Sequence, residues 1–200
     1  MTAAVPEPVR LAGDLVTLEP LRAAHHDELV AAATDGRLWE LWYTSVPSPG
    51  TMRADLDRKL ADQAAGRVLP FTVRANRTGT AVGVTTYLNL ELDVPRLEIG
   101  STWTARSAQR SGVNAESKLL LLTHAFETIG CLAVEFRTHW HNAQSRTAIL
   151  RLGAKQDGVL RNHRRMPDGS LRDTVVYSIT DSEWPAVRSS LRHRLALRAG

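Results

Sequence analysis

Cysteine is almost absent from this sequence: Cys131 is the only one in 200 residues, so no disulfide can form within the chain. Such cysteine usage fits a reducing compartment, and we expect a cytoplasmic protein. No apolar run reaches the roughly 18 residues of a membrane span, and residues 1–8 lack the basic-then-apolar pattern of a secretory signal. We therefore expect no association with a membrane.

An excess of charge of one sign is also missing, since 25 basic residues stand against 21 acidic ones, a formal net charge of +4. This excess is too small to indicate a nucleic-acid binder. Basic residues nevertheless gather at residues 161–165 and 188–198. Two interpretations stay open: these stretches are solvated faces, or they attract an anionic partner such as coenzyme phosphates or an acidic substrate.

The chain shows no internal repeat and no long linker, so we expect one domain over residues 1–200, with residues 1–10 flexible. Apolar periodicity and turn residues predict the secondary structure. Strands are expected at residues 15–18, 69–74, 81–90, 96–104, 132–138, 154–166 and 172–179. Helices are expected at residues 26–34, 51–66, 112–130, 142–152 and 181–200, with Thr51 and Asp181 as N-caps of the second and the last.

Three of these strands follow one another as antiparallel neighbours, and a strand-helix-strand-helix-strand run comes after them. This order predicts an α/β (α+β) fold with a mixed, mostly antiparallel sheet of about seven strands and helices on both faces.

Residues 98–116 are the most informative segment, because a strand ends there, a polar loop follows and an amphipathic helix begins. This arrangement points free backbone N–H groups and the positive end of a helix dipole at one spot, which suits a pyrophosphate. The loop, residues 109–114, is neither a Walker loop nor a dinucleotide fingerprint. An ordinary strand-to-helix turn remains the alternative.

A second segment reinforces the first. Asn142-x-x-Ser145 followed by Leu152-Gly153-Ala154, together with Gln109-x-x-Gly112-x-Asn114, resembles the GNAT acyltransferases. More narrowly, it resembles the subgroup that includes the ribosomal-protein N-terminal acetyltransferases. The phrases at residues 98–100, 158–161, 166–169 and 172–178 resemble that subgroup too, and the likeness covers about residues 15–191.

The resemblance implies a sheet splayed into a V, where the strand ending near Thr104 parts from the strand at residues 132–138. The pantetheine arm of acetyl-CoA would lie in that V, and no metal would take part. Asn114 departs from the usual glycine or alanine, and we interpret it as a local substitute that can cap a helix. The implied acetyl-CoA-binding residues are Trp103, Thr104, Gln109, Arg110, Ser111, Gly112, Val113, Asn114, Asn142 and Ser145.

An amine attacks a thioester only in its neutral form, and a free α-amine has a pKa near 8, so a base is needed. Glu98 is the candidate general base, because it lies on the splaying strand between two apolar neighbours whose side chains point the other way. Burial would raise its pKa. The alternative is a structural carboxylate bound to backbone or to an arginine.

Many GNAT enzymes place a tyrosine acid seven residues after the motif asparagine, but Ile149 occupies that position here. Ser145 would replace the tyrosine by donating a hydrogen bond to the leaving sulfur. By resemblance, the acceptor pocket is shaped by Trp39, Trp42 and Tyr43, although core packing of the first two helices would explain them as well.

His139 and His141 share a strand face, but no third ligand stands at useful spacing, so we expect no metal site. Cys131 is expected to be a small buried hydrophobe and not a nucleophile.

The sequence therefore predicts an acetyl-CoA-dependent N-acetyltransferase that acts on a protein N-terminal α-amine or a small-molecule amine. A catalytically silent relative that binds the coenzyme is the alternative. The acceptor is not identified, no nucleic-acid partner is expected, and a homodimer stays open because dimers are common among relatives.

Overall fold

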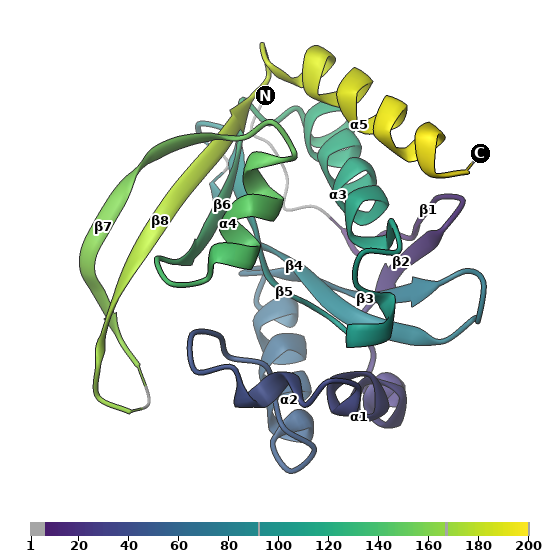
Figure 1. Cartoon of the computed structure of the whole chain (residues 1–200), viewed down its shortest axis with the longest axis vertical. Helices are drawn as coiled ribbons and strands as arrows, with labels where there is room; N and C mark the ends of the chain where they lie inside the picture. Colours follow the sequence, from purple (N-terminus) through teal and green to yellow (C-terminus); the bar gives the residue numbers. More distant parts are fainter. Residues whose placement is uncertain (1–6, 92, 167, 200) are drawn as a thin grey trace.

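The computed structural model describes residues 7–91, 93–166 and 168–199. The expectation of a flexible start, residues 1–10, therefore lies partly outside the described residues. One eight-stranded sheet runs through the molecule in the order β1-β2-β3-β4-β5-β6-β8-β7 (Figure 1). Its strands are β1 Leu11–Ala12, β2 Val16–Pro20, β3 Leu69–Ala75, β4 Ala81–Glu91, β5 Arg96–Thr104, β6 Ala133–His139, β7 Lys155–Arg165 and β8 Leu171–Thr180.

Seven of these strands match the predicted ones within about two residues, and β1 is the addition. It has only two residues, too few for any alternation to be visible in the sequence. All neighbouring strands are antiparallel except β5 and β6, which are parallel. The prediction of a mixed, mostly antiparallel sheet is confirmed.

In the described residues, five α-helices accompany the sheet: α1 His26–Thr34, α2 Met52–Ala64, α3 Val113–Thr123, α4 Ala143–Leu150 and α5 Trp184–Ala199. The single helix expected at residues 112–130 changes character, because the stretch His124–Ile129 continues α3 as a π-helix before Gly130 ends it at φ 77°. Thr51 is the N-cap residue of α2 as predicted, although its side chain caps no helix amide, whereas α5 begins at Trp184, three residues after Asp181. The hydroxyl of Thr51 accepts a hydrogen bond from the Ser48 amide, and the carboxylate of Asp181 accepts one from the Ser182 amide.

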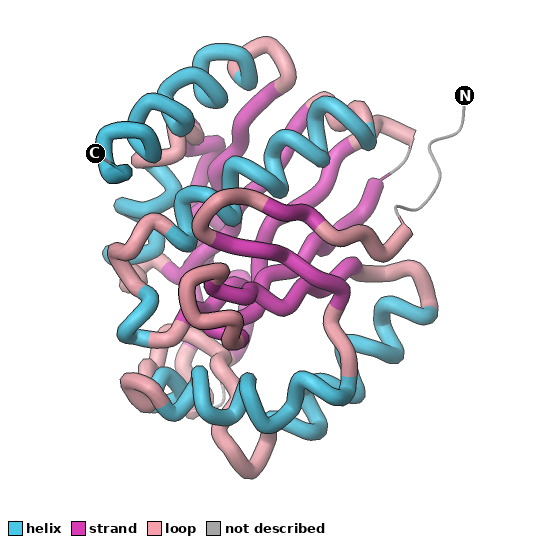
Figure 2. The backbone as a smooth tube through the Cα atoms, turned by 90° about the vertical axis from the view of Figure 1, so that its right-hand side faces the viewer, coloured by secondary structure: helices cyan, strands magenta, loops and turns pink. Residues whose placement is uncertain are grey.

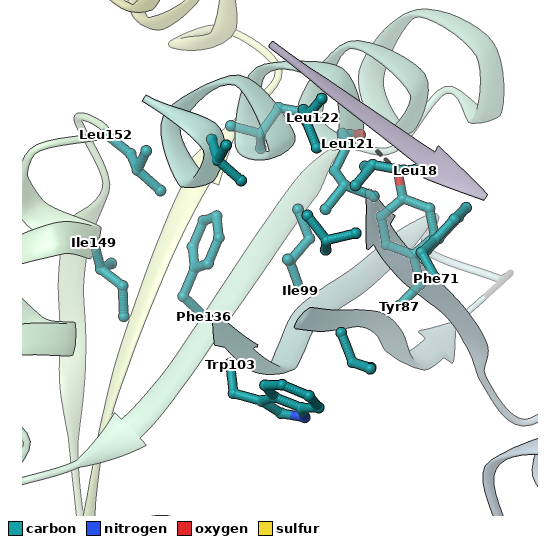
Figure 3. Close-up of a cluster of buried hydrophobic side chains, with 14 of the residues drawn as sticks. Leu18, Phe71, Tyr87, Ile99, Trp103, Leu121, Leu122, Phe136, Ile149 and Leu152 are labelled. Carbon is teal, nitrogen blue, oxygen red and sulfur yellow. Dashed lines mark hydrogen bonds between the residues drawn. The ribbon is translucent and has the colours of Figure 1, made fainter. Parts of the chain in front are cut away.

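The helices cover both faces of the sheet (Figure 2). Helices α3 and α5 lie side by side on one face, and α1 and α2 pack against β3 and β4 on the other (Figure 1). Under α3 the core contains Ile99, Leu121, Leu122 and Phe136 (Figure 3), all at most 3% exposed. The Tyr87 hydroxyl donates a hydrogen bond of 2.6 Å to the Leu121 carbonyl and ties α3 to β4.

The parallel pair β5–β6 is joined over a short stretch only. Its register runs from Arg96 opposite Ala133 to Glu98 opposite Glu135, although β5 continues to Thr104 and β6 to His139. Beyond Glu98 the two strands diverge, and this is the V that the resemblance implied.

Glu116, in the first turn of α3, fixes that helix to the start of the sheet. Its buried carboxylate accepts three backbone hydrogen bonds, from the amides of Asp14, Leu15 and Val16, at 2.7–3.0 Å. A Cβ at Gly13 would lie 2.6 Å from this carboxylate, so a larger residue there would displace it. Nothing in the sequence pattern indicates this contact, which spans about a hundred residues.

We predict that Glu116→Gln lowers the free energy of unfolding by about 1–3 kcal/mol, because an amide offers one acceptor oxygen where three amides need two. Urea denaturation of both proteins measures the loss. The control is Glu40→Gln, which removes only an exposed ion pair with Arg37 and should cost about 0–1 kcal/mol. Equal losses in the two variants would contradict the anchoring role.

Candidate active site

A β-bulge lies where β5 leaves β6. Between Val84–Thr86 on β4 and Gly100–Trp103 on β5, the second strand has one residue more, and Ser101 takes a positive φ of 45°. The extra residue reverses the alternation of side chains, so Thr102 faces α3 while Trp103 faces the same side as Glu98. The opening between β5 and β6, called here the mouth of the V, therefore has two chemically different walls: one on the α3 side, with Thr102, and one on the opposite side, with Glu98 and Trp103.

The loop before α3 has the geometry expected for an anion cradle. Gly112 takes φ 97° and Arg110 takes φ 61°, and α3 begins directly afterwards at Val113. Among the described residues, the backbone amides of Ser111 and Gly112 have no hydrogen-bond acceptor. Free amides at the positive end of a helix dipole are suited to a diphosphate.

Val113 and Asn114 lie at the start of α3, directly after Gly112. The Val113 side chain is buried in the core, and its backbone amide donates to the Ser111 hydroxyl at 3.4 Å. Asn114 lies inside the first turn of α3 with a negative φ, and its side chain forms no cap with the described residues. Its interpretation as a capping substitute is therefore wrong, and asparagine is accommodated there as an ordinary helical residue.

Gln109 spans the mouth of the V with its side chain. Its Nε2 donates to the Thr104 carbonyl at 3.0 Å, and its Oε1 accepts from Gln144 Nε2 at 3.3 Å. The end of β5 is thereby linked to the first turn of α4.

Asn142 is the N-cap of α4, and its Oδ1 accepts a hydrogen bond of 3.0 Å from the Ser145 amide. Its Nδ2 has no partner among the described residues, so the side chain can cap the helix and still donate to a ligand. The Ser145 hydroxyl is half-buried and likewise forms no hydrogen bond with the described residues. Ile149 belongs to the same buried cluster as Phe136 (Figure 3), so this position offers no acid, and the half-buried hydroxyl of Ser145 is the candidate donor on α4.

Lys118 lies behind the bulge and was not anticipated from the sequence. Its ammonium group is buried, and Nζ donates to the hydroxyls of Thr85 at 3.2 Å and Thr102 at 2.9 Å. It has no carboxylate partner among the described residues, and burial lowers the pKa of Lys118 to about 7. The α3 side of the mouth therefore holds a lysine that is close to neutral at physiological pH.

We predict that Lys118 makes the folded protein more stable as the pH rises from 7 towards 8.5. The lysine pKa is about 7 in the folded state and about 10.4 in the unfolded chain, so the unfolded state binds more protons across this range. Lys118→Met should remove that rise and should be the more stable protein at pH 7. Urea denaturation at the two pH values tests this, with Lys155→Met, an exposed ion-pair partner of Glu183, as the control that keeps the rise. A wild-type protein of constant stability would contradict the prediction.

Glu98 lies on the opposite wall, buried where β5 and β6 part. Its Oε2 accepts a hydrogen bond of 2.8 Å from Asn89 Nδ2 and lies 3.6 Å from Arg137 Nε. Burial raises the pKa of Glu98, and the nearby guanidinium of Arg137 only partly opposes this. Oε1 accepts no hydrogen bond from the described residues, and a Cβ at Gly100 would lie 2.6 Å from it. No local pattern in the sequence marks Asn89 or Arg137 as its partners.

The aromatic residues of the α1–α2 connection separate into two groups. Trp42 is 57% exposed and lies edge-on to Tyr43 and His139, with ring centroids 5.6 and 5.2 Å apart, and it also contacts His141. Trp39 instead packs against the core and lines a separate depression of about 480 Å³ beside Asp55 and Arg58. Trp42 therefore contacts the end of β6 through His139, and Tyr43 packs against Trp42.

Trp103 and Thr104, two of the expected acetyl-CoA-binding residues, lie beyond the bulge. Trp103 is 8% exposed, and its indole N–H has no acceptor among the described residues. Figure 3 shows it at the far end of the buried cluster from Leu121 and Leu122. The carbonyl of Thr104 is already occupied by Gln109.

Among the described residues, no three His, Cys, Asp or Glu side chains gather as metal ligands, and no helix has the length and apolar composition of a membrane span. Cys131 is buried in the core as predicted, and burial raises the pKa of its thiol to about 11.

Comparison with known proteins finds a matching family model and similar solved structures. The sequence model of the acetyltransferase (GNAT) domain matches residues 16–155. Among solved structures, a GCN5-related N-acetyltransferase from Brucella melitensis is 29% identical with a TM-score of 0.84, covering 97% of this chain and 88% of its own. A candidate acetyltransferase from T. thermophilus is 33% identical with a TM-score of 0.83, covering 95% and 98%.

Mycobacterium smegmatis RimJ in complex with CoA-disulfide shares the fold, with 21% identity, a TM-score of 0.77 and coverage of 94% and 93%. No curated protein matches the sequence. The family match, a fold with a V between β5 and β6, and the free amides before α3 lead to one conclusion: this chain belongs to the GNAT family and is an acetyl-CoA-dependent N-acetyltransferase.

Proposed function

We propose that the protein transfers the acetyl group to a primary amine, either a protein N-terminal α-amine or the amine of a small molecule, by direct attack in a ternary complex. The observation that carries this proposal is the carboxylate of Glu98. It is buried at the point where β5 and β6 part, its pKa is raised, and one of its oxygens is free of partners among the described residues.

The residues around Glu98 suit a general base. Asn89 and Arg137 both contact Oε2, which fixes the carboxylate plane and leaves Oε1 to receive the proton of the attacking amine. A raised pKa brings the base closer to that of an α-amine, near 8, so that proton transfer becomes less uphill. As the amine nitrogen bonds to the acetyl carbon, the C–S bond of the thioester breaks and the proton passes to Glu98.

The loop before α3 and the start of α4 would hold acetyl-CoA, the acetyl donor. The free amides of Ser111 and Gly112 suit the diphosphate of acetyl-CoA, and Asn142 Nδ2 suits an amide carbonyl of its pantetheine arm. The unpartnered hydroxyl of Ser145 would donate a hydrogen bond to the departing sulfur. Alignment of the two reactants contributes much of the rate in such a site, on the order of 7–11 kcal/mol.

Glu98→Gln should lower kcat by about 10²–10⁴-fold, because glutamine cannot accept the proton, while the Kd of acetyl-CoA stays nearly unchanged. In the wild type, kcat/KM should fall at acidic pH as Glu98 and the amine protonate, and the Glu98 contribution should vanish in the variant. Thiol release and calorimetry measure the two quantities.

The matched control is Glu135→Gln, a buried carboxylate on the adjacent strand that is held by Arg96 and Arg137. It should retain the wild-type shape of the pH profile. Equal losses of kcat in both variants, or unchanged turnover in Glu98→Gln, would assign Glu98 a structural role.

Direct attack also predicts that no acetyl-enzyme forms. Cys131→Ala should keep the wild-type kcat, because the Cys131 thiol is buried and remains protonated with a pKa of about 11. Initial-rate kinetics with both substrates varied should give intersecting lines. Parallel lines, or an acetylated protein detected by mass spectrometry when no amine is present, would show a covalent intermediate.

A further inference from the structure

Arginines and glutamates share the face of the sheet that Glu98 occupies. Glu98 pairs in register with Glu135, so both side chains lie on one face, and Arg137 follows Glu135 by two residues on β6. Thr174 on β8 pairs with His139, and Arg172 lies two residues before it and opposite Arg164 of β7. The alternation of strands therefore places all of them on the face away from α3.

Both carboxylates of this group already have arginine neighbours. Glu135 pairs with Arg96 and with Arg137, the latter at 2.8 Å, and Glu98 lies 3.6 Å from Arg137. Arg172 and Arg164 form no ion pair with any described residue, and the only side-chain hydrogen bond of Arg172 there joins its Nε to the Thr174 hydroxyl at 3.0 Å. Arg172 is half-buried, so its guanidinium faces the site without an ion-pair contact to any described carboxylate.

The unpaired charge lies close to the reacting groups. Arg172 and Glu98 are near enough to influence each other's pKa, and Arg172 also lowers the pKa of His139, after burial. His139 in turn contacts Trp42. Arg172 is thus close both to Glu98 and to His139, whose ring contacts Trp42, a residue expected to shape the acceptor pocket.

A half-buried unpaired cation is costly to fold and is compensated when an anion binds beside it. We propose that the acceptor of this enzyme carries a carboxylate or phosphate near its amine, and that Arg172, assisted by Arg164, binds this anion while Glu98 faces the amine. This inference rests on the proposed function and names its acceptor class. Polyamines and aminoglycosides, which are polycations, are disfavoured by the same two arginines.

Matched acceptor pairs test the proposal by thiol release with acetyl-CoA. Alanine is compared with alaninamide, phosphoethanolamine with ethanolamine, and a peptide beginning Ser-Glu with one beginning Ser-Gln. The anionic member should have the higher kcat/KM, by about tenfold or more, in at least one pair. The pair that responds identifies the source of the anion: a free amino acid, a phosphate ester or an acidic peptide.

Arg172→Gln should abolish this preference by raising KM for the anionic member, with little change for the neutral one. The control is Arg161→Gln, whose exposed guanidinium is paired with Asp173 at 2.6 Å and which should keep the preference. Because Arg172→Gln removes an unpaired charge, its melting temperature should not fall. Equal kcat/KM within every pair, or equal losses for both members in Arg172→Gln, would overturn the proposal.

A binding experiment separates this inference from the proposed function. Calorimetry compares N-acetylalanine with its neutral methylamide on protein saturated with CoA, which keeps the coenzyme's own phosphates out of the comparison. Tighter binding of the anion, lost in Arg172→Gln, supports the anion site even if no amine of the panel is acetylated. Turnover of neutral amines combined with equal binding of the two ligands would leave the proposed function standing and exclude the anion site.

Discussion

The early end of the pairing between β5 and β6 is the constraint on which the site depends. Two parallel strands that part after Glu98 and Glu135 leave backbone groups facing a gap, and buried backbone groups require partners. An extended ligand with its own amides can supply them much as an added strand would. The bulge at Ser101 and the anion cradle before α3 both lie beside that gap. The coenzyme site is thus a consequence of sheet geometry, and individual side chains refine it.

The bulge also separates two electrostatic environments that alternation alone would have merged. Without the extra residue, Thr102 would face the same side as Glu98, and the Lys118 ammonium would lose its shorter hydrogen bond. As built, Lys118 is buried on the α3 side and Glu98 on the other, with β5 between them. Each group has its pKa displaced towards neutrality by burial, in opposite directions. A strand irregularity of one residue therefore keeps a base and a buried amine apart.

Much of the fold could be predicted from the sequence, because strands β3–β8 and α1 are marked by strong periodicity and by turn residues. The loop before α3 and the start of α4 near Asn142 could be found for the same reason, since their signals are local. Glu116, Lys118, Asn89 and Arg172 could not, because each acts through contacts that no local pattern marks. The π-helical end of α3 has no signal in apolar spacing, and Trp39 shows that neighbours in sequence need not share a site. The division into one domain and the individual roles of the site residues stay predictions.

Gln109 gives the mouth of the V a mechanical property. Its side chain is bonded to the end of β5 on one side and to Gln144 in the first turn of α4 on the other. The loop that faces the diphosphate and the helix that carries Ser145 are therefore tied through one amide, with the longer of its two bonds, 3.3 Å, on the α4 side. A displacement of the loop is transmitted to α4, and the reverse also holds. The position of the diphosphate and the position of the thioester in a bound coenzyme would therefore depend on each other.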